Sequence, residues 1–117
     1  MKRIIFVDDD ENLLDGLKRN FRKKKDEWEM IFLNDGRKAL DYLENNRIDI
    51  IITDYKMSGM NGLELLAQVK EKHPDVRRVI LSGQSEKEIF EKASELAHKY
   101  LSKPCNPDEF IKYIDSQ

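Results

Sequence analysis

Aspartates follow two separate apolar runs of this chain, in positions where carboxylates could do chemistry. "FVDDD" places Asp8, Asp9 and Asp10 directly after one run, and "IIITD" ends another run with Asp54. Carboxylates held close together raise one another's pKa unless a cation compensates them. Mg²⁺ is the hard cation that takes oxygen ligands, keeps several waters and is often shared with a phosphate. We therefore expect at least two of the three consecutive aspartates to hold Mg²⁺.

A hydroxyl and an ammonium group follow two further apolar runs. Ser82 stands in "VILSG" and Lys103 in "YLSKP". A carboxylate can act as a nucleophile toward phosphorus and form an aspartyl phosphate. The transferred group spreads charge over three oxygens, so the site needs donors and cations around it. Ser82, Lys103, Mg²⁺ and backbone N–H groups would supply them.

Short apolar runs alternate with helical patterns, which predicts an α/β fold whose parallel sheet is covered on both faces. The expected strands are Ile4–Val7, Met30–Leu33, Ile48–Thr53, Arg78–Leu81 and Lys99–Leu101. Five helices are expected to alternate with them. Right-handed crossovers favour the doubly wound strand order 2-1-3-4-5, with "IDIIIT" in the centre. Ligands bind at the carboxyl ends of such strands, where all the polar groups above stand.

Length and composition predict a single domain over residues 1–117. Charged residues make up 38% of the chain but the net charge is only −2, which argues against nucleic acid as an obligatory partner. The basic run Arg22–Lys25 is interpreted as the solvated end of a helix. One cysteine, Cys105, suits a reducing compartment. No apolar run reaches the ~20 residues of a membrane span and no signal-peptide pattern opens the chain, so we expect a cytoplasmic protein without a membrane partner.

With these residues in place, the chain resembles the receiver domains of response regulators in two-component signalling. The motifs that carry the resemblance are "FVDDDENLL", "DIIITDYKMSGMNGLELL", "VILSG" and "YLSKP", and it extends over essentially the whole chain. It implies a flavodoxin-like (βα)5 fold and a phosphorelay function, in which a sensor histidine kinase or phosphotransfer protein phosphorylates Asp54. It implies no enzyme beyond self-phosphorylation from a phosphodonor and slow hydrolysis of the product.

The resemblance also implies a Mg²⁺ site. Asp8, Asp9 and Asp54 would bind the ion together with the backbone carbonyl of Lys56. The side chains of Lys56 and Gln84 lie two positions after Asp54 and Ser82. We hypothesise that they flank the phosphoryl group and tune its lifetime by controlling access of water.

A switch is implied as well. Ser82 and Lys103 would contact the phosphoryl oxygens, and Tyr100 is the switch aromatic that follows Ser82 inward. The face formed by the last two expected helices and the strand Lys99–Leu101 would then meet an output domain or partner protein. A homodimer formed on phosphorylation is left open.

Three positions depart from the family pattern. Ser58 stands where a proline is usual, Ser82 is the smaller of the two usual hydroxyl residues, and Cys105 replaces a residue that is commonly aromatic or aliphatic. The string "AHKYLSKPCNPDE" is similar to receivers joined to HD-related output domains. We expect a domain that is excised from, or able to join, a larger regulator.

Two other functions compete with this interpretation. A phosphatase similar to the haloacid dehalogenases would make Asp8 the nucleophile and Asp10 the acid, but Asn12 breaks its motif and Asp54 would have no role. A pseudo-receiver would keep the fold as a binding module without being phosphorylated.

Structural roles are expected for Asp10 as a helix cap and for Gly59 and Gly62 as backbone devices, through positive φ or close approach.

Overall fold

Five parallel strands form one sheet in the computed structural model, which describes residues 1–83, 89–103 and 106–117. The strands are β1 Lys2–Val7, β2 Trp28–Leu33, β3 Ile50–Asp54, β4 Arg77–Ser82 and β5 Lys99–Ser102. Their order is β2-β1-β3-β4-β5, and every neighbouring pair is parallel. The predicted fold class and strand order are confirmed.

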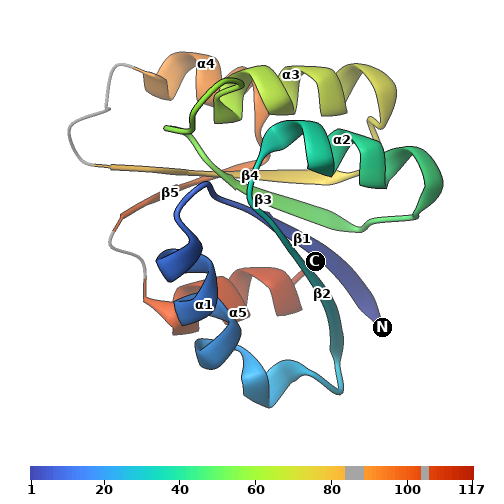
Figure 1. The fold of residues 1–117 in the computed structure, drawn as a ribbon, viewed down its shortest axis with the longest axis vertical. Helices are drawn as coiled ribbons and strands as arrows, with labels where there is room; N and C mark the ends of the chain where they lie inside the picture. Colours follow the sequence, from blue (N-terminus) through green and yellow to red (C-terminus); the bar gives the residue numbers. More distant parts are fainter. Residues whose placement is uncertain (84–88, 104–105) are drawn as a thin grey trace.

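Helices cover both faces of this sheet. They are α1 Glu11–Asn20, α2 Gly36–Asn45, α3 Gly62–Lys72, α4 Phe90–Leu96 and α5 Pro107–Asp115, with a 3-10 turn η1 at Arg22–Lys24. Figure 1 shows α2, α3 and α4 on one face and α1 and α5 on the other. No helix in these described ranges is long and apolar enough to cross a membrane.

The central strand β3 is buried at all five positions, as its apolar sequence predicts. Its predicted limits, 48–53, were wrong by two residues at the start and one at the end. The ladder with β1 begins at Ile50; just before it, the carboxylate of Asp49 accepts the backbone N–H of Arg3 at 2.9 Å. Asp54 is the last residue of the strand and pairs in register with Leu81. The sheet therefore fixes the backbone of the candidate nucleophile.

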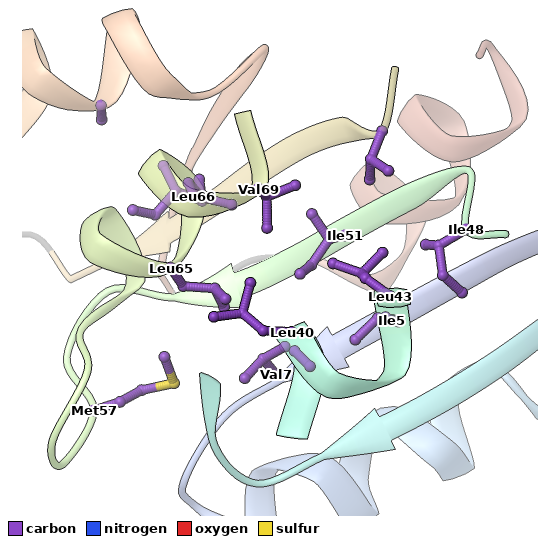
Figure 2. Packing of buried hydrophobic residues seen from close by; sticks show 14 of the residues in the cluster. Ile5, Val7, Leu40, Leu43, Ile48, Ile51, Met57, Leu65, Leu66 and Val69 are labelled. Carbon is purple, nitrogen blue, oxygen red and sulfur yellow. The ribbon is translucent and has the colours of Figure 1, made fainter. Parts of the chain in front are cut away.

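Two apolar cores lie on opposite faces of the sheet. The core under α2 and α3 is drawn in Figure 2, where side chains of both helices point toward those of β1 and β3; its labelled members are Ile5, Val7, Leu40, Leu43, Ile48, Ile51, Met57, Leu65, Leu66 and Val69. The other core joins β1, β3 and β4 to α1 and α5 through Ile4, Phe6, Leu14, Ile52, Val79, Phe110 and Ile114. Burial of this apolar surface holds the helices against the sheet and so sets the position of the loops at its edge.

The remaining differences from the predicted elements are at their ends. β1, β2 and β4 each begin one or two residues earlier than predicted. The basic run follows α1 as the turn η1, and Arg22, Lys23 and Lys25 are exposed, as predicted. Lys24 differs, because its ammonium lies 2.8 Å from Asp115 and over the Trp28 ring. A distant acidic partner and a nearby aromatic ring thus hold one of the four basic side chains.

Candidate functional site

The carboxyl ends of four strands bring acidic, hydroxyl and ammonium groups to one edge of the sheet. Asp8 follows β1, Asp54 ends β3, Ser82 ends β4 and Lys103 follows β5. The ammonium nitrogen of Lys103 lies 2.7 Å from Oδ1 of Asp54 and 3.8 Å from Oδ2 of Asp8. These three side chains, far apart in the sequence, therefore meet as the strand order predicts.

Lys103 is positioned by its own backbone. Its N–H donates to the carbonyl oxygen of Ser82 at 2.8 Å, which joins the ends of β5 and β4. The Ser82 residue is fully buried, and its hydroxyl donates a long bond of 3.4 Å to the carbonyl oxygen of Gly83. A bond of this length is weak, so little holds the hydroxyl in that direction.

Asp8 is an acid in a place that disfavours its charge. Burial is the main cause that raises the pKa of its carboxyl to about 6, and the negative charge of Asp54 adds to the rise. The N–H of Asp10 and the ammonium of Lys103 both act to lower this pKa. The Asp10 N–H donates to Oδ1 at 2.9 Å, whereas Oδ2 is buried without a hydrogen-bond partner. A buried anionic oxygen without a donor is costly unless a cation compensates it, and the Lys103 ammonium, at 3.8 Å, is too far to donate a hydrogen bond. Its chemistry fits a hard divalent ion.

Asp9 and Lys56, the other predicted metal ligands, lie on the exposed rim of the site. Oδ2 of Asp9 accepts the backbone N–H of Ser58 at 2.8 Å, so the loops after β1 and β3 touch. In the described ranges, no three acidic, histidine or cysteine side chains are already gathered closely enough to hold a metal ion. The donors are nevertheless of the type that Mg²⁺ takes.

Asp10, the third consecutive aspartate, has the predicted structural role. Its carboxylate accepts the N–H groups of Asn12 at 3.0 Å and Leu13 at 3.3 Å and so caps α1. N-terminal N–H groups have no partner inside the helix, and an aspartate at this position satisfies them. This role turns its carboxylate toward α1.

Two glycines after β3, one in the loop and one at the start of α3, are backbone devices, as predicted. Gly59 has a φ of 75°, in the left-handed region that favours glycine. A Cβ on Gly62 would lie 2.3 Å from the carbonyl oxygen of Asp54 and 2.9 Å from Cα of Tyr55. The start of α3 therefore rests directly on the backbone of the strand end that carries Asp54.

Tyr100 is half-buried on the edge strand, in register with Ile80. Its ring meets that of Phe90 edge-on, with 5.2 Å between the ring centres. Phe90, on α4, is 55% exposed. Gln84, predicted to flank the phosphoryl group, lies outside the described residues, as does Cys105.

Sequence reasoning missed two of these contacts. Ser58 was noted for lacking proline, which was also the signal that its N–H was available to Asp9. Phe90 carried no signal, because only the fold places it beside Tyr100.

Comparison with known proteins shows to which family the chain belongs. A family model described as the response regulator receiver domain matches residues 4–115. The uncharacterized transcriptional regulatory protein YesN of Bacillus subtilis is 34% identical over 98% of this chain and 32% of its own length. The DNA-binding transcriptional regulator NtrC of Klebsiella pneumoniae is 35% identical over 68% of this chain and 17% of its own. The chain thus spans no more than about a third of these curated relatives.

Solved structures agree with these relatives. The signal receiver domain of an HD domain-containing protein from Pseudomonas fluorescens Pf-5 has a TM-score of 0.90 and 26% identity, covering 98% of this chain and 92% of that one. The response regulator protein TrrA of Thermotoga maritima, in complex with Mg²⁺ and BeF, has a TM-score of 0.84 and 27% identity, covering 99% and 98%. The chain therefore belongs to the response regulator receiver domains of two-component systems.

Proposed function

We propose that this receiver domain accepts a phosphoryl group on Asp54 from a histidine kinase or phosphotransfer protein. The observation that carries the proposal is the contact of 2.7 Å between the Lys103 ammonium and Oδ1 of Asp54, beside the buried carboxylate of Asp8. A lysine at this distance keeps the Asp54 carboxylate oriented and would also meet the incoming negative charge.

The covalent step exchanges one bond to phosphorus for another. A carboxylate oxygen of Asp54 attacks the phosphorus, and the bond from phosphorus to the donor's imidazole nitrogen breaks with its electron pair passing to that nitrogen. Lys103 neutralises charge on the phosphoryl oxygens. Attack of water on the same phosphorus later restores the Asp54 carboxylate and releases phosphate. The domain is an enzyme only in this limited sense.

Asp8, Asp9, Asp54 and the carbonyl of Lys56 are the residues that would hold Mg²⁺ in this proposal. When bound, Mg²⁺ would neutralise the carboxylates and the phosphoryl oxygens together. The buried oxygen of Asp8 without a hydrogen-bond partner supports this assignment. The solved complex of TrrA with Mg²⁺ and BeF is consistent with it.

The response to phosphorylation would pass through Ser82 and Tyr100. The weakly held Ser82 hydroxyl is expected to turn toward the new phosphoryl oxygens, and Tyr100 to move into the space behind it. The face of α4, β5 and α5 would then present a different surface to an output domain or partner protein. Receiver domains of this family work with histidine kinases and output domains, and an HD-related output domain is one candidate here.

The phosphatase alternative is less well supported by the geometry. It needs the Asp10 carboxyl as an acid beside Asp8, whereas that carboxylate is occupied by two N–H groups of α1. It also leaves the contact of Lys103 with Asp54 without a function.

Intact mass after incubation with acetyl phosphate and Mg²⁺ tests the proposal. We expect one added phosphoryl group on the unmodified chain, no addition on Asp54→Asn, and no addition without Mg²⁺. Asp49→Asn is the matched control, because Asp49 directly precedes the opposite end of the same strand and accepts a backbone N–H. It is expected to be phosphorylated normally.

Phosphorylation of the Asp54→Asn variant would contradict the proposal and point to another acceptor. Absence of any gain from acetyl phosphate would call for beryllofluoride with Mg²⁺. A chain that does not bind beryllofluoride either would behave as a pseudo-receiver.

A further inference from the structure

The Asp9 carboxylate is held by a backbone group of a different loop. Its Oδ2 accepts the N–H of Ser58 at 2.8 Å. Asp9 lies directly after Asp8, at the end of β1, and Ser58 lies in the loop between β3 and α3. Because both residues are exposed at the rim of the site, neither is immobilised by packing in a core. The hydrogen bond is therefore what gives this carboxylate a direction.

The donor is a main-chain group, and its presence depends on residue type. Every residue except proline carries a backbone N–H, so Ser58 can donate where proline could not. The following residue, Gly59, has a φ of 75° and turns the chain directly after the donor. The turn and the bond together join the loop that carries Asp9 to the loop that carries the Lys56 carbonyl.

We propose that the Ser58 N–H is a positioning group that orients Asp9 for a divalent cation; this inference rests on the Mg²⁺ site of the proposed function. Bonding through Oδ2 fixes the rotamer of the carboxylate and leaves its other oxygen for the ion. Hydrogen bonds to metal-ligating carboxylates orient them, and their loss typically lowers metal affinity 10- to 100-fold. Since this bond is exposed to water, we expect about tenfold, the low end of that range.

A pair of variants at one position separates the N–H from the side chain. Ser58→Pro removes the N–H, and Ser58→Ala keeps it while deleting the hydroxyl. We expect the Mg²⁺ dissociation constant, measured by titration calorimetry without any phosphodonor, to rise about tenfold in Ser58→Pro. It is expected to stay within twofold of the unmodified chain in Ser58→Ala.

Proline could also disturb the loop, because it restricts the residue before it and Met57 is buried. A second variant avoids this: incorporation of the α-hydroxy acid analogue of serine at position 58 replaces the N–H by an ester oxygen without a ring. The same rise in dissociation constant is expected. The urea midpoint of each variant, measured without Mg²⁺, shows whether the fold itself has been weakened.

The outcomes distinguish the two proposals. Weaker Mg²⁺ binding in both N–H-deleted variants, with normal binding in Ser58→Ala, supports the positioning role. Binding that is equal in all variants, or equally weakened in Ser58→Ala, overturns that role while leaving the Mg²⁺ site in place. If the unmodified chain itself binds no Mg²⁺, the metal part of the proposed function fails, and the positioning role fails with it.

Discussion

Gly62 and Asp54 meet at the backbone, where the helix α3 begins against the end of β3. A Cβ at Gly62 would come within 2.3 Å of the Asp54 carbonyl oxygen, a distance at which something has to move. The atoms it would meet belong to the main chain of the central strand, which cannot turn away as a flexible side chain can. One missing methyl group therefore helps to set the position of the candidate nucleophile.

Replacing this glycine tests the contact. We expect Gly62→Ala to lower the free energy of unfolding by about 1–3 kcal/mol, the usual cost of overpacking, and to slow phosphorylation by acetyl phosphate. Urea denaturation and a time course of intact mass would measure the two effects.

Gly16→Ala is the matched control, since a Cβ there would have its nearest neighbour 3.8 Å away, on the Arg19 side chain. It lies inside α1, where alanine is preferred to glycine by about 0.5–1 kcal/mol. Gly16→Ala is therefore expected to be as stable as the unmodified chain or more so. Equal stability of Gly62→Ala and Gly16→Ala would show that α3 adjusts without cost.

Much of the site could be predicted at this scale because strand ends carry a strong signal. Asp8, Asp54 and Lys103 each follow or end an apolar run, and parallel strands bring such positions to one edge. The bond between Ser58 and Asp9 could not be predicted, since it depends on how two loops approach each other. The type of a residue indicates whether it has a hydrogen-bond donor. Only the path of the backbone shows which acceptor that donor contacts.

At the scale of the elements, the C-terminal end of α4 is held by hydrogen bonds from β4 and α3. The buried guanidinium of Arg78, on β4, donates to the carbonyl oxygen of Leu96 at 2.7 Å, and the Lys70 ammonium of α3 donates to that of Glu95 at 2.9 Å. Carbonyl groups in the last turn of a helix have no partner inside it, so these cations satisfy them. At its other end, α4 carries Phe90 against Tyr100.

A pH-sensitive contact joins β4 to the start of β5 beside this attachment. Nδ1 of His98 accepts the Arg78 N–H at 3.0 Å, which requires an unprotonated Nδ1. Loss of hydration lowers the pKa of His98, and the positive charges of Arg78, Arg77 and Lys70 lower it further. The folded chain thus binds this proton less readily than the unfolded chain does.

We expect acidification to weaken the fold through this histidine. Because the unfolded pKa is about 6.5 and the folded pKa is lower, the unfolded state takes up more protons as pH falls through 6.5, and the stabilising contribution is lost. The urea midpoint should therefore fall more between about pH 7.5 and pH 5.5 in the unmodified chain than in His98→Asn. Asparagine keeps an acceptor for the N–H but does not titrate, so an equal fall in both chains would exclude His98 as the cause.

For the molecule as a whole, one sheet serves two cores. Neighbouring residues of β3 point to opposite faces, so Ile51 belongs to the core under α2 and α3 while Ile52 belongs to the core with α1 and α5. Both side chains are almost fully buried. Because each core rests on the same central strand, damage to either is expected to spread through the sheet.

Single truncations on the two faces test this coupling. Ile51→Val and Ile52→Val are each expected to lower the free energy of unfolding by about 1 kcal/mol, the typical cost of one buried methyl group. Unfolding should remain a single transition, with fluorescence of Trp28, which lies in the second core, coincident with far-UV circular dichroism. Transitions that separate in Ile51→Val would show that the two faces unfold independently.

The strand order of the whole fold could be predicted more completely than the contacts on its surface. Alternating apolar runs and helical patterns predicted the strand order, because few arrangements bury all five runs and keep the crossovers right-handed. In the Arg22–Lys25 run, the exposure of three residues was predicted, but the ion pair of Lys24 with Asp115, at the end of α5, was not. The charge pattern of residues 22–25 carries no information about a partner 91 positions away in the sequence.

The spread of the site along the chain has a consequence for how a cell makes this protein. Asp8 is synthesised before Asp54, and Asp54 before Lys103, and the three meet only when β1, β3, β4 and β5 lie side by side. A chain still emerging from the ribosome has no assembled site until its last strand is in place.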